Sequence, residues 1–184
     1  MTGKHRHIFL CGFSGSGKST VGAILASRLS LRFVDLDVQI EKAAGKSIIT
    51  IFQMDGERQF RLLERRMISE FLNSQEPRSV LSLGGGALHS DQIIQNLKDG
   101  GILVYLSCAV IEIDRRLRRL NDRPMLAVSR SQSRTDRIER IKKLLNSRKG
   151  KYTQADIKIS TTNRTPAQVV GLILKQLKQN YGFV

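Results

Sequence analysis

Five short apolar segments divide the chain, at residues 7–11, 32–35, 79–83, 102–106 and 157–159. Runs of this length and composition are typical of strands that lie buried inside a sheet. Between them, apolar residues recur at steps of three and four, as in helices that bury one face. Because strands and helices alternate along the chain, the pattern predicts an α/β domain with a five-stranded parallel sheet flanked by helices.

Turn and capping residues set the expected helix boundaries. We expect helices over residues 18–29, before Gly45, and over 48–52, 57–72, 92–97, 111–120 and 137–149, with a last helix after Thr165. Ser47 and Thr165 favour helix starts, and glycines mark several helix ends. The segment 121–135 is polar and breaks the helical period, so we interpret it as a lid.

Length and composition limit the class of protein. With 184 residues, of which 40% are hydrophobic, the chain suits one well-packed domain spanning 1–184. No apolar run approaches the ~18 residues that cross a bilayer, so we expect a cytoplasmic protein with no membrane partner. We also expect a monomer. The two cysteines and three histidines lack the spacing of a disulfide framework or a zinc site.

A complete phosphate-binding pattern, G-x-x-x-x-G-K-[ST], lies between the first predicted strand and the first predicted helix. Its glycines let backbone N–H groups turn toward phosphate oxygens, and the helix start adds its positive dipole end. In this pattern Lys18 reaches the outer phosphates and the Ser19 hydroxyl ligates Mg²⁺. The sequence therefore predicts an ATP and Mg²⁺ site that includes Gly15, Ser16, Gly17, Lys18, Ser19 and Thr20.

Two further features lie at the ends of later strands. Asp35 and Asp37 follow the second strand, at the edge where open α/β sheets bind ligands. Asp35 is the acid available to the metal, because the third strand ends in Gly84, Gly85 and Gly86 instead of a carboxylate. Three consecutive glycines exceed what one turn needs, so they indicate close backbone approach to a ligand.

The formal net charge of +15 raises a choice between two classes of function. A clustered basic face would bind nucleic acid, whereas a kinase would place arginines around anionic substrates. No basic repeat interleaved with aromatic residues is present, and aromatic content is only 5%. Phosphate loops also occur in switches, motors and transporters, but a short chain with an arginine-rich lid favours phosphate transfer to a small molecule.

An ordered set of motifs resembles the shikimate kinase family over nearly the whole chain. The set comprises residues 12–22, 35–37, 45–48, 55–57, 60–61, 83–86 and 123–124, and residue 148 with 152. The resemblance implies a three-layer P-loop kinase fold with a substrate-binding segment at about 36–64 and a lid at about 121–135. It also implies transfer of the γ-phosphate of ATP to the 3-hydroxyl of shikimate, a step of aromatic amino acid biosynthesis.

The resemblance further implies a role for individual residues. Asp37 would contact the shikimate hydroxyls and act as the base, with Lys18 and Arg123 completing the catalytic set. Arg123 would contact phosphate and substrate together. Arg61 and Arg148 would hold the substrate carboxylate.

The backbone and two neighbouring positions complete this implied site. The N–H groups of Gly84, Gly85 and Gly86 would reach the substrate, and Glu64 would orient Arg61. An arginine between 115 and 119 would stack on adenine, with Arg116 and Arg119 both open.

Several alternatives stay open at the level of sequence. Asp37 could instead cap the following helix. Gly150 stands where the family usually has proline, two residues after Arg148. This difference leaves open the direction in which the Arg148 side chain points. A gluconate kinase would share the phosphate loop and the acidic strand end without needing the triple glycine or the arginine pair. A basic nucleic-acid-binding P-loop module is the alternative from another class.

Overall fold

The protein is represented by a computed structural model that describes residues 7–75, 77–118 and 133–182. Five strands form one parallel sheet in the order β2-β3-β1-β4-β5. The strands are β1 (His7–Cys11), β2 (Arg32–Asp35), β3 (Ser79–Ser82), β4 (Gly101–Ser107) and β5 (Ile157–Ser160). This confirms the predicted α/β fold. Because all five strands run the same way, their carboxyl ends meet at one edge of the sheet.

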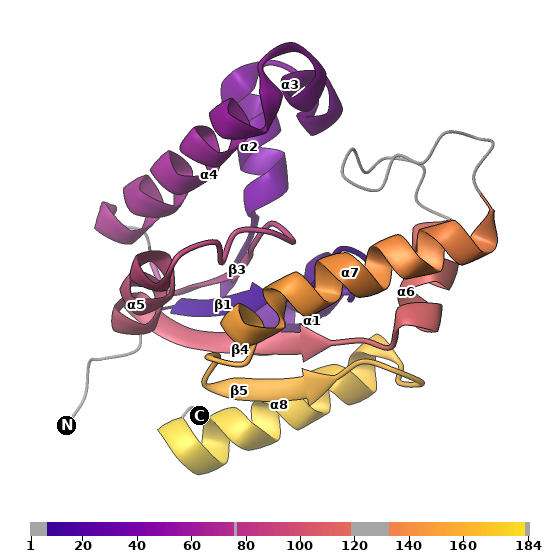
Figure 1. Cartoon of the computed structure of the whole chain (residues 1–184). Coiled ribbons are helices and arrows are strands. Elements are labelled where there is room, and N and C mark those ends of the chain that lie inside the picture. Colours follow the sequence, from indigo (N-terminus) through magenta and orange to yellow (C-terminus); the bar gives the residue numbers. More distant parts are fainter. Residues whose placement is uncertain (1–6, 76, 119–132, 183–184) are drawn as a thin grey trace.

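Helices cover both faces of the sheet, as Figure 1 shows with α8 on one side and α5 and α7 on the other. The described helices are α1 (Lys18–Arg28), α2 (Leu36–Ala44), α3 (Ile48–Met54), α4 (Gly56–Asn73), α5 (Asp91–Gly100), α6 (Val110–Leu117), α7 (Arg134–Tyr152) and α8 (Pro166–Tyr181). Helices α2, α3 and α4 extend away from the sheet and form what we call the helical lobe (Figure 1).

Alternate residues of β1, β2, β3 and β4 enter different cores. Ile8 and Leu10 of β1 pack in a cluster with residues of α1 and α8. Phe9 and Cys11 face the opposite way and pack in a cluster with residues of α2, α3, α4, α5 and α7. Successive side chains on a strand point to opposite faces, so a sheet covered on both sides needs apolar residues at every position. The uninterrupted apolar segments of the sequence have this physical cause.

Capping residues begin the helices largely where the sequence predicts. The Ser47 hydroxyl accepts a hydrogen bond from the backbone N–H of Thr50 and starts α3. Thr165 forms a capping box at the start of α8. Among the described residues, no helix combines the length and apolar character that crossing a membrane requires.

Helix α7 is longer than predicted at both ends. Ser133 and Asp136 exchange side-chain to backbone hydrogen bonds in a capping box, so the helix begins at Arg134 and not at residue 137. Residues 134 and 135, at the end of the segment predicted to be a lid, are thus part of α7. Residues 121–132, with Arg123, and also Arg119 lie outside the described residues.

Candidate active site

The phosphate loop between β1 and α1 has the conformation that its glycines predict. Gly12, Gly15 and Gly17 have positive φ angles of 143°, 81° and 97°, values that residues other than glycine rarely adopt. Lys18 is 7% exposed, and its ammonium donates to the carbonyls of Gly12 (2.9 Å) and Phe13 (3.2 Å). The loop therefore forms a turned backbone with a lysine held across it, at the N-terminus of α1.

The two side chains predicted to bind metal lie together. The Ser19 hydroxyl donates to Oδ2 of Asp35 at 2.6 Å. The other oxygen of Asp35 accepts from the backbone N–H of Asp37 at 3.1 Å and caps α2. A hydroxyl beside a carboxylate is a pair of hard oxygen donors, the kind that Mg²⁺ prefers, so these residues fit that cation. The N-cap of α2 is thus Asp35, and Asp37 in the first turn of the helix is not its cap.

A cavity of about 680 Å³ lies between the phosphate loop, the helical lobe and α7. Its polar lining includes Asp37, Arg61 and Arg148. Its apolar lining comes mainly from the helical lobe and comprises Val38, Ile48, Ile49, Phe52 and Phe60 together with Phe13 and Leu144. The cavity is large enough for a small metabolite, and its arginines suit an anionic one.

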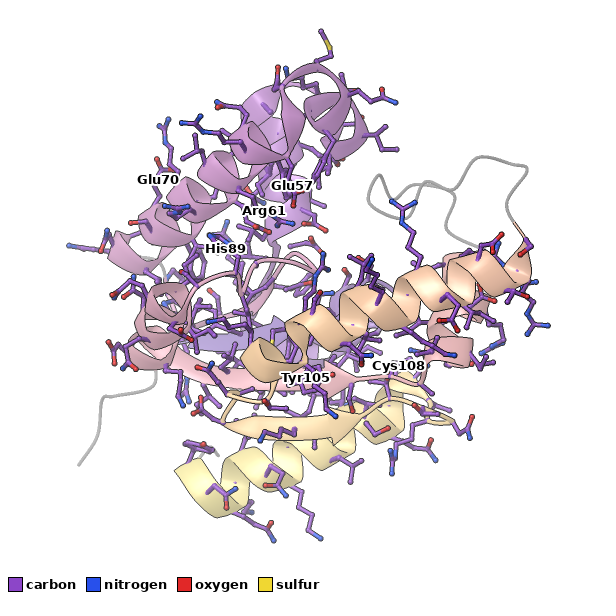
Figure 2. The ribbon with its side chains drawn as sticks, viewed as in Figure 1. Glu57, Arg61, Glu70, His89, Tyr105 and Cys108 are labelled. Carbon is purple, nitrogen blue, oxygen red and sulfur yellow. The ribbon has the colours of Figure 1, made fainter. Side chains whose placement is uncertain are left out.

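Arg61 is held in place by two carboxylates of its own helix, α4 (Arg61 and Glu57 are labelled in Figure 2). It donates to Oε2 of Glu64 at 2.6 Å and to Oε1 of Glu57 at 3.2 Å. Glu64 is fully buried, and burial raises the pKa of its carboxyl while the charge of Arg61 opposes that rise. A buried carboxyl that accepts a hydrogen bond from one edge of the guanidinium fixes the side chain, as the predicted role of Glu64 requires.

The three glycines after β3 bring backbone close to the functional side chains. A Cβ on Gly84 would overlap Oε1 of Glu64, and one on Gly86 would lie 2.5 Å from a guanidinium nitrogen of Arg61. On Gly85 it would lie 2.8 Å from the hydroxyl oxygen of Ser14. None of the three has a positive φ angle. Space, and not backbone conformation, is what demands glycine here.

Arg148 reaches the same glycines from the last turns of α7. Its guanidinium donates to the Gly85 carbonyl at 2.9 Å and lies 5.6 Å from the centre of the Phe13 ring. Helix α7 continues through Gly150, and the Lys151 ammonium anchors its end by a 2.6 Å ion pair with Asp91. Glycine at position 150 therefore leaves Arg148 within the cavity.

Arg116 of α6 lies against the other side of the phosphate loop. It donates to the carbonyls of Gly15 (3.3 Å) and Thr161 (3.1 Å), and Glu112 accepts from its Nε at 2.8 Å. These contacts join the loop to the end of β5. The sequence left Arg116 and Arg119 open as the arginine that stacks on adenine. Of these two, Arg116 is among the residues that the structure describes.

The comparisons with known proteins agree with this geometry. The sequence model of the family described as shikimate kinase matches residues 14–178. A shikimate kinase of Persephonella marina is 42% identical over 173 residues, which cover 94% of this chain and 99% of that protein. The chain belongs to the shikimate kinase family. A shikimate kinase of Chlorobaculum tepidum is 39% identical over 178 residues, covering 96% of this chain and 92% of that protein.

Solved structures of the shikimate kinase family have the same fold. The shikimate kinase of Acinetobacter baumannii in complex with shikimate superposes with a TM-score of 0.87 at 32% identity, covering 96% of this chain and 95% of that one. A gluconokinase of Sinorhizobium meliloti gives a TM-score of 0.57 at 16% identity, covering 97% of this chain and 94% of that one. At that identity the second likeness concerns the fold alone.

Sequence reasoning missed several residues that line or support the site. Glu41 lies in the cavity wall, and its carboxylate accepts from the backbone N–H of Ile48 at 2.9 Å, which joins α2 to α3. Glu41 is four residues from Asp37, which puts both acids on one face of α2. This spacing is the signal in the sequence that could have identified Glu41. Ser14 and Tyr152 lay within the family motifs without an assigned role. Only their approach to Gly85 reveals one.

Proposed function

We propose that this protein is a shikimate kinase, which transfers the γ-phosphate of ATP to the 3-hydroxyl of shikimate and releases ADP. The observation that carries the proposal is the cavity that joins a phosphate loop to Asp37 and to two arginines, in a chain of the shikimate kinase family. The product, shikimate 3-phosphate, would serve aromatic amino acid biosynthesis.

ATP binds through the phosphate loop in this proposal. Backbone N–H groups of residues 15–20 and the Lys18 ammonium contact the phosphates, at the positive end of the α1 dipole. Ser19 and Asp35 hold Mg²⁺, which when bound neutralises part of the phosphate charge. Arg116 borders the adenine, because its guanidinium already lies against Gly15 at the rim of the loop.

Shikimate binds in the cavity on the other side of the loop. A carboxylate matches the fork of a guanidinium in two parallel hydrogen bonds, and Arg61 and Arg148 both line the cavity. Glu57 and Glu64 hold Arg61 before the substrate arrives, which lowers the entropic cost of binding. The apolar wall, with Phe52 and Phe60, packs against the ring of the substrate.

Asp37 is the proposed base. Its Oδ1 lies beside Gly84, 3.0 Å from where a Cβ would stand, at the side of the cavity nearest Asp35. As the substrate 3-hydroxyl oxygen bonds to the γ-phosphorus, its proton passes to the Asp37 carboxylate, and the bond from phosphorus to the leaving ADP oxygen breaks. Arg123 remains a predicted catalytic residue that lies outside the described part of the chain.

A coupled assay of ADP release tests this proposal. Shikimate, gluconate and an oligonucleotide are each added to the folded protein with Mg-ATP. We expect turnover with shikimate alone. Gluconate-dependent turnover would instead indicate a gluconate kinase, and steeply salt-dependent binding of the oligonucleotide without turnover would indicate a nucleic-acid module.

Substitution of Asp37 tests in the same assay whether this residue is the base. Asp37→Asn should abolish shikimate-dependent turnover and leave ATP affinity nearly unchanged. Loss of ATP binding would place Asp37 in the nucleotide site instead. The monomeric state, the cytoplasmic location and the absence of a nucleic-acid partner remain predictions.

A further inference from the structure

The turn that contains the triple glycine has no side chain of its own to fix it. The backbone N–H of Ala87 donates to the Gly84 carbonyl at 3.1 Å, which closes a β-turn with Gly85 and Gly86 at its centre. The peptide between the two central residues sets the turn type, and types I and II differ by a flip of that peptide. Glycine tolerates both orientations, because it has no Cβ to exclude positive φ.

Two donors from α7 hold the central peptide in one orientation. The Gly85 carbonyl accepts from Arg148 at 2.9 Å and also from the Tyr152 hydroxyl. A trans peptide is planar, with its C=O and N–H in opposite directions. The two hydrogen bonds therefore direct the Gly86 N–H away from Tyr152. A flip of the peptide would reverse that N–H, which the resemblance to the shikimate kinase family assigns to the substrate.

Tyr152 is fixed far more firmly than Arg148. Its side chain is 1% exposed, and its ring stacks on Tyr105 of β4 with centres 5.0 Å apart and planes at 16° (Tyr105 is labelled in Figure 2). Burial raises the pKa of the Tyr152 phenol well above its ordinary value, although the nearby Arg148 charge opposes the rise. The hydroxyl therefore keeps its proton and stays a donor throughout the pH range of a folded enzyme.

Arg148, by contrast, has a second task. The proposed function gives its guanidinium to the substrate carboxylate, and a donor that turns to the substrate weakens or leaves its bond to Gly85. At that moment the glycine turn depends on the remaining donor. The Gly85 carbonyl is part-buried in the cavity wall, and the loss of both donors there would carry a free-energy penalty, so the remaining hydrogen bond favours the observed turn type.

We propose that Tyr152 is a positioning residue, which holds the Gly85–Gly86 peptide in its substrate-binding orientation while Arg148 binds the substrate carboxylate. The proposal rests on the proposed function for the identity of the substrate. It assigns the phenol no proton transfer and no contact with shikimate. Tyr152 acts through the turn alone.

Tyr152→Phe tests the proposal, because it removes the hydroxyl and keeps the stacked ring. We expect the KM for shikimate to rise about 3- to 10-fold, the range for a lost hydrogen bond to a part-buried carbonyl. The KM for ATP should change less than twofold. Tyr105→Phe is the matched control, since it removes a hydroxyl from the other ring of the same stack, and both KM values should stay as in the wild type. An unchanged KM for shikimate in Tyr152→Phe, or an equal rise for ATP, would overturn the proposal.

A backbone measurement tests the turn directly and needs no turnover. In ¹⁵N relaxation dispersion on an Arg148→Lys background, where the Arg148 bond to the Gly85 carbonyl is removed, the amides of Gly86 and Ala87 should show exchange once Tyr152→Phe is added and none once Tyr105→Phe is added. Arg148→Lys alone keeps Tyr152, and its Gly86 amide should remain as in the wild type. Exchange at Gly86 in Arg148→Lys would contradict the idea that Tyr152 holds the turn alone. Absence of shikimate turnover in the wild-type protein would refute the proposed function and leave this measurement valid.

Discussion

At the scale of single residues, Glu112 shows how one carboxylate holds an arginine, Arg116, against the phosphate loop. It accepts from Arg115 at 2.7 Å and 2.8 Å and from Arg116 at 2.8 Å. The hydrogen bonds from Arg115, and to a smaller extent that from Arg116, lower the pKa of Glu112 from 4.5 to about 2. A depressed carboxyl pKa stabilises the folded state above the unfolded pKa, and this stabilisation disappears as the pH falls from about 4.5 toward 2.

Glu112→Gln should therefore lower the melting temperature at pH 7 and have little effect near pH 2. Thermal unfolding followed between pH 7 and pH 2 measures the difference between variant and wild type. Glu70→Gln is a suitable control, because the Glu70 pair with Arg66 is exposed on both sides and exposed pairs contribute little. A constant difference across the whole pH range would contradict the assigned cause.

Gly84 offers a second prediction at the residue scale. A Cβ at this position would overlap Oε1 of Glu64 and approach Oδ1 of Asp37 to 3.0 Å. Forcing these carboxylates apart costs about 1–3 kcal/mol, so Gly84→Ala should reduce kcat/KM for shikimate about 10- to 100-fold. Steady-state kinetics measure the loss, and an alanine variant with full activity would show that this crowding has no role in the site.

At the scale of elements, helix α7 carries a glycine that the fold does not need. A Cβ on Gly150 would meet no atom of the described residues within 4 Å, and the helix runs through the position. Alanine is more favourable than glycine in a helix by about 1 kcal/mol, so Gly150→Ala should raise the melting temperature by about 2–4 °C. Gly171→Ala in α8, which is equally open, should act in the same direction.

Thermal unfolding of both variants checks this expectation, with shikimate kinetics as the control. The KM for shikimate should not change in Gly150→Ala, because Arg148 already reaches the Gly85 carbonyl from a continuous helix. A lower melting temperature in this variant alone would mean that glycine at 150 relieves a strain in α7.

At the scale of the whole molecule, the cavity lies between the helical lobe, the phosphate loop and α7, so a ligand there contacts separate parts of the fold. Binding to the folded state alone stabilises it by about 2.7 kcal/mol at 100 times Kd. For a chain of this length, shikimate at that concentration should raise the melting temperature by about 5–10 °C. A thermal-shift assay measures the rise, and gluconate at equal concentration should produce none. An equal shift with gluconate would argue against the arginine pair as the source of specificity.

Much of the site could be predicted because its residues belong to local motifs. The phosphate loop and Ser19 needed only the spacing along the chain, since glycines, lysine and hydroxyl lie within one turn and one helix start. Asp35 and Asp37 could not be separated in this way. Which of two acids caps α2 depends on the side-chain conformation, and the structure gives the cap to Asp35.

The remaining features depend on contacts between distant segments. The extension of α7 to Arg134 rests on a capping box that the polar sequence around it concealed. The role of Tyr152 depends on a turn 67 residues away in the chain. Periodicity reports which face of a helix is apolar, and it carries no information about which carbonyl lies opposite a given hydroxyl.

The sequence by itself determined the sheet, the phosphate loop and the family, because buried parallel strands must be apolar throughout and phosphate binding needs a local spacing. The tertiary structure decided how these parts meet. It brought the Gly84–Gly86 turn between Arg61 of α4 and Arg148 of α7, and it placed a buried phenol on the Gly85 carbonyl. Those contacts join segments far apart in the chain, so they exist only once the strands have paired and the helices have packed.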